Sequence, residues 1–118
     1  MLSNSGINKV LLFGEITGDP FLNKTDKNQN YLCVTIVTKE AIKKGGDLAE
    51  HQEFHKIKIA EKLVNQEDLQ LQEGQTIYVE GRIHTTAVFD ERNIKRYNLE
   101  VFASKIEVIR FVTAPAIA

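Results

Sequence analysis

One strand-like segment, His51 to Ala60, carries an aromatic ring and amino groups on the same side. Alternate residues of a strand point to opposite faces, so Phe54, Lys56 and Lys58 share a face with Ala60. The opposite face has the pattern of a core and consists of His55, Ile57 and Ile59. A ring can stack on a base and ammonium groups can neutralise phosphates, so this face is typical of single-stranded nucleic-acid binding. A solvated strand whose phenylalanine fills a groove or an oligomer contact would show the same pattern.

Further basic and aromatic residues are expected on two hairpins beside this strand. In the fourth predicted strand the residues expected to face inward are Ile77, Val79 and Ile83. Those expected to face outward are Tyr78, Glu80, Arg82 and His84. The hairpin after this strand carries Phe89, Arg92, Lys95 and Arg96. The loop after the second predicted strand, from Ile42 to Glu50, extends a lysine cluster that consists of Lys39, Lys43 and Lys44. The predicted DNA-binding residues are Lys39, Lys43, Lys44, Phe54, Lys56, Lys58, Arg82, Phe89 and Arg96.

Other chemistry finds little support. His51 and His55 are four residues apart, but they lie on a strand beside the single Cys33, and zinc needs about four ligands. The glycines of Gly14-Glu15-Ile16-Thr17-Gly18 lack the Gly-Lys-Ser/Thr of a phosphate loop. Ser3, Ser5 and Ser104 stand in no nucleophile context. We therefore expect no enzyme activity, no cofactor and no metal.

Length and composition limit the classes of protein to consider. The chain has 118 residues with 42% hydrophobic and 26% charged residues, which fits one soluble domain. Fifteen Lys and Arg against sixteen Asp and Glu give a net charge of −1, whereas nucleic-acid binders are usually basic. There is no membrane-length apolar run and no secretory signal, and the single cysteine agrees with a reducing cytosol. Where the charges lie matters more than their sum.

The order of segments predicts an all-β fold, a five-stranded OB barrel with one short helix between its third and fourth strands. The helix is expected at Glu61 to Leu71, and the strands are expected at Lys9–Thr25 (broken at Thr17 to Pro20), Tyr31–Lys39, His51–Ala60, Thr76–Thr86 and Tyr97–Arg110. An SH3-like barrel or a small β-sandwich has similar strands, but the helix position favours the OB barrel. Residues 1–110 would form this domain and residues 111–118 a short tail.

Three separated motifs resemble bacterial and mitochondrial single-stranded DNA-binding proteins. The first is Ile7-Asn8-Lys9-Val10-Leu11-Leu12-Phe13-Gly14 with Gly18-Asp19-Pro20. The second is Glu53-Phe54-His55-Lys56-Ile57, and the third is Glu73-Gly74-Gln75-Thr76-Ile77-Tyr78-Val79-Glu80-Gly81-Arg82-Ile83. The likeness covers about residues 6 to 110 and keeps the family's order.

The resemblance implies an OB-fold homotetramer that coats single-stranded DNA in replication, recombination and repair, in the bacterial cytoplasm with the nucleoid. By position, it implies that Phe54 stacks on bases and that His55 and Tyr78 lie at subunit contacts. Three aromatic positions of the family are occupied by Ile42, Ala60 and Val88, and the chain has no tryptophan. Phe89 would replace the last of these rings if its hairpin were bulged. The family's acidic tail, which recruits replication proteins, has no counterpart in residues 111–118.

Two other kinds of protein fit the same residues. A primosomal accessory OB protein also lacks the aromatics and the tail, and is usually dimeric. A protein-interaction barrel with weak or no DNA binding agrees with the near-neutral charge. Retention of Phe54, His55 and the Tyr78-Val79-Glu80-Gly81 block favours the tetrameric family, so we expect a tetramer before a dimer.

Overall fold

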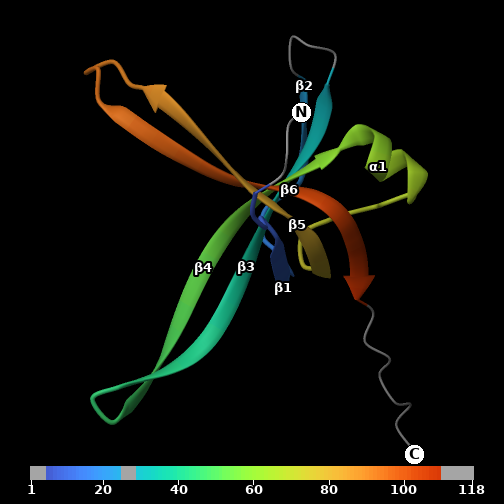
Figure 1. Ribbon diagram of the computed structural model, residues 1–118. Coiled ribbons are helices and arrows are strands. Elements are labelled where there is room, and N and C mark those ends of the chain that lie inside the picture. Colours follow the sequence, from blue (N-terminus) through green and yellow to red (C-terminus); the bar gives the residue numbers. More distant parts are fainter. Residues whose placement is uncertain (1–4, 25–28, 110–118) are drawn as a thin grey trace, which may run out of the picture.

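A small barrel with two long β-hairpins projecting from it makes up the protein in this computed structural model, which describes residues 5–24 and 29–109 (Figure 1). The elements of these residues are β1 (Val10–Ile16), β2 (Phe21–Lys24), β3 (Asn30–Lys44), β4 (Asp47–Ala60), α1 (Glu61–Gln66), β5 (Thr76–Phe89) and β6 (Lys95–Ile109). Thr25, Arg110 and the tail predicted at 111–118 lie outside the described residues.

The strand pairing confirms the predicted OB barrel. The sheet order is β1-β5-β6-β4-β3-β2, and a further pairing of β1 with β3 closes the barrel. All of these pairs are antiparallel except β4 with β6. Because β1 and β2 are the two parts of one interrupted strand, as predicted, the barrel has five strands, and α1 follows the third of them.

Alternating aliphatic residues form the core. Ile57 and Ile59 of β4 are buried, and so are Ile77 and Val79 of β5, which confirms the predicted inward faces of both strands there. Burying one such side chain contributes about 1.5–3 kcal/mol. The remaining buried apolar residues are Ile16, Val34, Ile36, Val37, Val101 and Ile106.

The loop predicted between Ile42 and Glu50 is instead part of a hairpin, so this prediction is wrong. Strands β3 and β4 stay paired to Lys44 and Asp47, and only Gly45 and Gly46 form the turn. Both glycines have positive φ, 62° and 91°, as a tight two-residue hairpin turn requires. The lysines and glycines of this segment suggested a loop, but its residues still alternate as a strand does.

The β5–β6 hairpin is also longer than predicted, and this overturns the expected burial of Ile83. Strand β5 runs to Phe89 and β6 begins at Lys95. The register of β5 against β6 shifts between Glu80 and Gly81, and at Gly81 a Cβ would lie 2.3 Å from the carbonyl oxygen of Phe102. Beyond this point β5 leaves the barrel. Ile83 lies beyond this shift, where the hairpin projects from the barrel, and is 41% exposed.

The helix is shorter than predicted. It ends at Gln66 rather than Leu71, and Asp68 adopts a positive φ of 49° just after it. The N–H of Leu69 then donates to the carbonyl of Val64 at 2.9 Å, which turns the chain back toward the barrel. None of the helices in the described residues has the length and apolar character needed to cross a bilayer.

The two hairpins make the molecule extended. Its radius of gyration is 17.8 Å, against about 13 Å for a compact domain of 100 residues. In Figure 1 the β3–β4 hairpin and the β5–β6 hairpin point in different directions from the barrel. They extend the sheet faces of the barrel into the solvent, so both faces of each hairpin are open to partners.

Candidate nucleic-acid interface

Strand β4 carries the face that the sequence predicted. Phe54 is 63% exposed, Lys56 is exposed and Lys58 is half-buried. The alternate residue His55 is half-buried, and its Nε2 lies 2.9 Å from Oγ1 of Thr38. The predicted alternation of β4 is therefore confirmed, and its outer face holds one ring and two amino groups.

A stack of three rings lies next to Lys58 on the same face. Phe102 of β6 is paired with Lys58 of β4 and with Arg82 of β5, so these side chains share one side of the sheet. The Phe102 ring stacks on Tyr31 with centroids 5.7 Å apart and planes 9° apart. The Phe102 ring also stacks on His84, with the two ring centroids 4.7 Å apart and the ring planes at 16° to each other. Bases prefer such flat aromatic surfaces.

Two cations accompany these rings. The guanidinium of Arg82 lies 5.5 Å from the centroid of Phe102, and Nζ of Lys58 lies 5.8 Å from that of Tyr31. Both distances are within the range of cation–π attraction. The positive charge of this face is therefore held directly against the ring stack.

The rings line a groove of about 600 Å³, which we call the ring groove. Its lining combines apolar surface with three cations and one carboxylate, Glu80, which lies 3.9 Å from Lys9. It consists of Ile7, Asn8, Lys9, Tyr31, Lys58, Ala60, Glu80, Gly81, Arg82, Phe102, Ala103 and Ser104. A volume of this size is typical of ligand sites. The groove lies on the strand face that OB barrels use for oligonucleotides.

One wall of the ring groove is held by Asn8. Its side-chain Nδ2 donates to the carbonyl of Ile83 at 2.8 Å, and its Oδ1 accepts from the N–H of Ile83 at 2.9 Å. The amide thus pairs with β5 as a neighbouring strand would, at the point where β5 leaves the barrel. This contact aligns the segment before β1 along the groove.

Glu100 offsets part of the positive charge of this face. Its carboxylate is 10% exposed and lies 3.2 Å from Nζ of Lys58, which is 21% exposed. The cysteine opposite Lys58 on β3, Cys33, has a raised pKa because burial disfavours its thiolate. Lys58 therefore serves an ion pair as well as the groove, while Lys56 forms no ion pair among the described residues.

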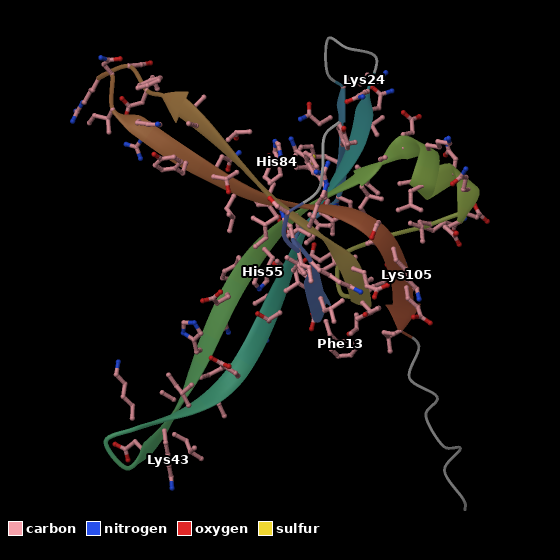
Figure 2. The ribbon with its side chains drawn as sticks, in the orientation of Figure 1. Phe13, Lys24, Lys43, His55, His84 and Lys105 are labelled. Carbon is pink, nitrogen blue, oxygen red and sulfur yellow. The ribbon has the colours of Figure 1, made fainter. Side chains whose placement is uncertain are left out.

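The β3–β4 hairpin separates its three predicted lysines. Lys39 and Lys43 are on the side of Val37, the partner of Phe54, and so extend the face of β4. Lys44, one residue further, points to the opposite face at the turn. Figure 2 shows Lys43 at the far end of this hairpin and His84 near the crossing of the strands.

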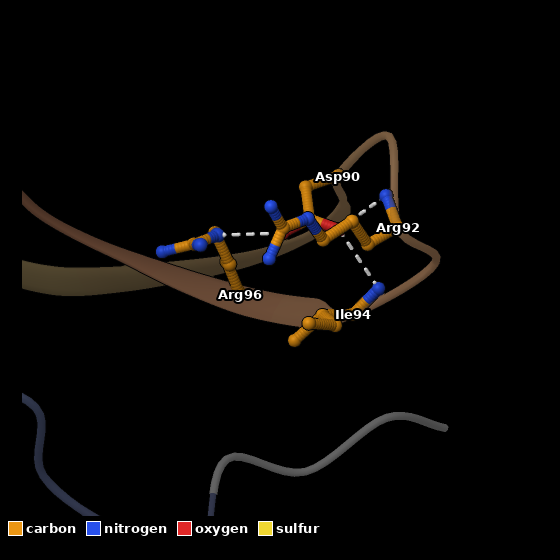
Figure 3. Close-up of polar contacts among 4 residues, drawn as sticks. All are labelled: Asp90, Arg92, Ile94 and Arg96. Atoms are coloured by element: carbon orange, nitrogen blue, oxygen red, sulfur yellow. Dashed lines mark hydrogen bonds and ion pairs between the residues drawn. The ribbon is translucent and has the colours of Figure 1, made fainter.

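The tip of the β5–β6 hairpin is organised by Asp90 (Figure 3). Its Oδ1 accepts from the N–H groups of Arg92 and Ile94, and its Oδ2 accepts from Nε of Arg96, each at 2.9 Å. The Ile94 N–H bond, followed by those from Arg96 and Arg92, holds the pKa of the Asp90 carboxyl below its usual value. Arg96 is thereby ion-paired but remains 71% exposed.

The structure does not bring Phe89 together with Phe54, the other aromatic residue predicted to bind DNA, or with the ring groove. The hairpin is regular here, with Val88 opposite Arg96 and Phe89 opposite Lys95, so the bulge that would turn Phe89 toward the ring groove does not occur. Phe89 lies on the reverse face of the hairpin, with Tyr97 and Leu99, all of which are exposed. Lys95 Nζ lies 5.3 Å from the centroid of Tyr97 on that face.

Sequence reasoning missed Tyr31 and Phe102, although both stood within predicted strands. The alternation rule applied to β6 would have placed Phe102 on the outer face, because Val101 beside it is buried. No comparable signal indicated that Tyr31 would reach it from β3. Among residues 5–24 and 29–109, His, Cys, Asp and Glu side chains form no group of three that could hold a metal.

The two residues expected at subunit contacts lie on different strands. Tyr78 of β5 is half-buried and is paired with Phe13 of β1, which is 54% exposed. Desolvation and the neighbouring Glu80 carboxylate raise the pKa of Tyr78. His55 lies at the base of the β3–β4 hairpin (Figure 2). The outer surface of β1 and β5 thus exposes aromatic and aliphatic side chains.

Together the closed five-stranded barrel and the ring groove define an OB-fold protein with an oligonucleotide-type groove. The chain belongs to the single-strand binding protein family, whose family model matches residues 7–109.

Similar proteins share this assignment. The Single-stranded DNA-binding protein 1 of Chlorobaculum tepidum is 31% identical over 106 residues, which cover 88% of this chain and 65% of that protein. The Single-stranded DNA-binding protein of Bacteroides thetaiotaomicron is 26% identical over 106 residues, or 87% and 66% of the two chains. The chain therefore spans slightly less than two thirds of the length of these relatives.

Two solved structures share the fold. The SSB of Plasmodium falciparum, solved in complex with ssDNA, superimposes with a TM-score of 0.78 at 18% identity, over 92% of this chain and 100% of that one. A deletion mutant of the single-stranded DNA-binding protein from Thermus aquaticus gives a TM-score of 0.74 at 24% identity, over 89% and 51%.

Proposed function

We propose that this protein binds single-stranded DNA without strong sequence preference and performs no catalysis. The observation that carries the proposal is the parallel stack of Tyr31, Phe102 and His84 in a groove beside Lys58 and Arg82. Stacking accepts any base and amino groups accept any phosphate, so such a surface binds strands of mixed sequence. Membership of the single-strand binding protein family supports it.

The strand would follow the outer face from one hairpin to the other. Bases would stack on Phe54 and on the ring stack, and phosphates would contact the exposed cations along this face, which are Lys39, Lys43, Lys56, Arg82 and Arg96. Lys58 would contribute less charge because Glu100 pairs with it. Lys44 and Phe89 point to the reverse faces of the hairpins, so their proposed role requires that the strand wraps around a hairpin.

On the family membership we also propose a role in replication, recombination and repair in the bacterial cytoplasm. We also propose a homo-oligomer, a tetramer before a dimer. Leu11, Phe13 and Tyr78 support a contact surface on β1 and β5, because Leu11 and Phe13 are more than half exposed there. Light scattering at micromolar concentration tests this: a monomer contradicts the proposal, and a dimer favours the primosomal type.

Titration with a labelled oligothymidine at several salt concentrations tests DNA binding. Anisotropy should rise on binding at low salt, and duplex DNA of the same length should compete poorly. Affinity should fall as the salt concentration rises, because the release of counterions from the DNA then favours binding less. The absence of any anisotropy change at low salt would leave the protein-interaction barrel as the better explanation.

A further inference from the structure

A row of outward side chains crosses the sheet from the ring groove to the edge strand β2. The strands follow one another in the order β5-β6-β4-β3-β2, and directly paired residues of neighbouring strands share one side of the sheet. The pairs, followed from strand to strand, give the row Arg82, Phe102, Lys58, Cys33 and Phe21. The first three members line the ring groove, and Phe21 ends the row on the other side.

Phe21 presents its ring on the outer face of β2. It is 62% exposed, nearly the same fraction as Phe54 on β4. The next residue, Leu22, points to the opposite side of the sheet, because its partner Leu32 packs against the core. The side of β2 that faces the core is therefore the side of Leu22, and the ring of Phe21 belongs to the outer face.

The separation of Phe21 from the ring stack is one that a bound strand can bridge. Because β4 and β3 lie between β6 and β2, Phe21 is about 14 Å from Phe102 along the row, at about 4.8 Å for each step between strands. An OB fold covers about 4–16 nucleotides of single-stranded nucleic acid. A strand of that length extends well beyond the ring stack, and the row offers it a second ring to reach.

The surface between the two rings suits this crossing. Cys33 and Lys58 lie on β3 and β4, the second and third strands of the barrel, whose face binds oligonucleotides in OB folds. Burial raises the pKa of the Cys33 thiol, so near neutral pH it carries no charge that would repel a phosphate. Lys58 adds an ammonium group, although Glu100 offsets part of its charge. The row thus presents a ring, a neutral thiol, an ammonium group and a second ring.

We propose that Phe21 is a further base-stacking residue, so that the binding face extends across β3 to the edge strand β2. The inference rests on the proposed single-strand binding and adds to it a place where the strand is held. A ring stacks on any base, so Phe21 would add affinity without adding a sequence preference. An exposed phenylalanine at a subunit contact would show the same exposure, and the experiment separates the two roles.

Single tryptophans test the position directly, because the chain has no tryptophan of its own. Phe21→Trp places an indole on the outer face of β2, and Leu22→Trp is the matched control on the opposite face of the same strand. A base that stacks on an indole quenches its fluorescence. We expect oligothymidine to remove most of the tryptophan fluorescence of Phe21→Trp and to leave that of Leu22→Trp nearly unchanged. The affinity of Phe21→Trp should equal that of the wild type, because a ring is retained.

Phe21→Ala and Leu22→Ala measure the effect on affinity. Phe21→Ala should weaken oligothymidine binding by about tenfold, as expected for one lost stacked base, with the same salt dependence. Leu22→Ala should bind as the wild type does, and thermal melting and light scattering compare the folding and oligomeric state of all variants. Equal or absent quenching at the two positions, wild-type affinity of Phe21→Ala, or a changed oligomeric state of Phe21→Ala would overturn the stacking role while leaving single-strand binding intact. If the wild type does not bind oligothymidine at low salt, the proposed function itself fails.

Discussion

Tyr31 and Phe102 stack although their strands are not neighbours in the sheet. Strand β4 lies between β3 and β6, and Tyr31 is paired there with Ala60. Phe102 lies opposite Lys58, two residues before Ala60 on β4, and both rings line the ring groove together with Ala60. Position 60 is one where the family resemblance implies a phenylalanine. The stack of Tyr31 on Phe102 thus supplies an aromatic surface in the groove that Ala60 lines, where the sequence suggested that one was lost.

The first prediction concerns this stack. Phe102→Leu should lower the affinity for oligothymidine by about 1–3 kcal/mol, because Phe102 stacks on both other rings and so holds together the flat surface on which bases would stack. The dependence of affinity on salt should stay the same, since no charge is removed. Anisotropy titrations at three salt concentrations measure both quantities. Wild-type affinity in a folded variant would show that bases do not use the stack.

The second prediction separates the two functions of Lys58. Glu100→Gln should tighten DNA binding and steepen its salt dependence by about one, because the Lys58 ammonium becomes free for a phosphate. Lys58→Met leaves the Glu100 carboxylate without its partner and should destabilise the fold, by less than the about 3–5 kcal/mol of a fully buried pair.

Urea unfolding and the same titrations measure these effects. The double variant, with Met at position 58 and Gln at position 100, should recover most of the stability, because the unpaired carboxylate is gone. If Glu100→Gln bound DNA as weakly as a variant without Lys58, the ion pair would be needed in the bound state, which contradicts the prediction.

The third prediction compares neighbours on β4. Phe54→Ala should cost about 1–3 kcal/mol in affinity with little change in salt dependence, since Phe54 is exposed and uncharged. Lys56→Ala should lose affinity mainly at low salt, with a slope smaller by about one. Unchanged binding of Phe54→Ala with an intact oligomer would make Phe54 a packing residue.

The barrel was predictable because the second half of β4 and the first half of β5 alternate between buried and more exposed residues. The inward and outward faces of β4 followed from His55, Ile57 and Ile59 alone, and they are confirmed. The position of α1 after β4 was enough to identify the OB order. These features depend on neighbours in the sequence, which the alternation rule can read.

What could not be predicted depends on contacts between distant strands. Ile83 has a core residue type, but the register shift at Gly81 carries it beyond the barrel. Tyr31 and Phe102 meet across β4, which no local pattern indicates. The ion pair of Lys58 with Glu100 likewise joins residues that are far apart in the sequence. The outline of the face that we propose binds DNA was therefore predictable, and its ring stack and charge balance were not.

The last prediction concerns how the tip of the β5–β6 hairpin responds to low pH. The Asp90 carboxylate accepts bonds from the N–H groups of Ile94 and Arg92 and from Arg96, so its pKa is lowered in the folded protein. A carboxyl whose folded pKa lies below its unfolded value stabilises the fold fully above the unfolded pKa. This contribution is lost as the pH falls through the lower, folded value.

Amide NMR signals of Arg92 and Ile94 should therefore stay constant down to about pH 4 and then shift, with a midpoint below the ordinary carboxyl pKa of 3.8. In Asp90→Asn the same signals should show no such titration, because the side-chain amide keeps an acceptor oxygen but has no proton to gain. Asp90→Asn also removes the ion pair between Asp90 and Arg96. The guanidinium of Arg96 is then free to contact a phosphate, so DNA binding at low salt should strengthen slightly. A midpoint at or above 3.8 would mean that Asp90 is not held by these bonds in solution, and that the tip is ordered by its backbone turn alone.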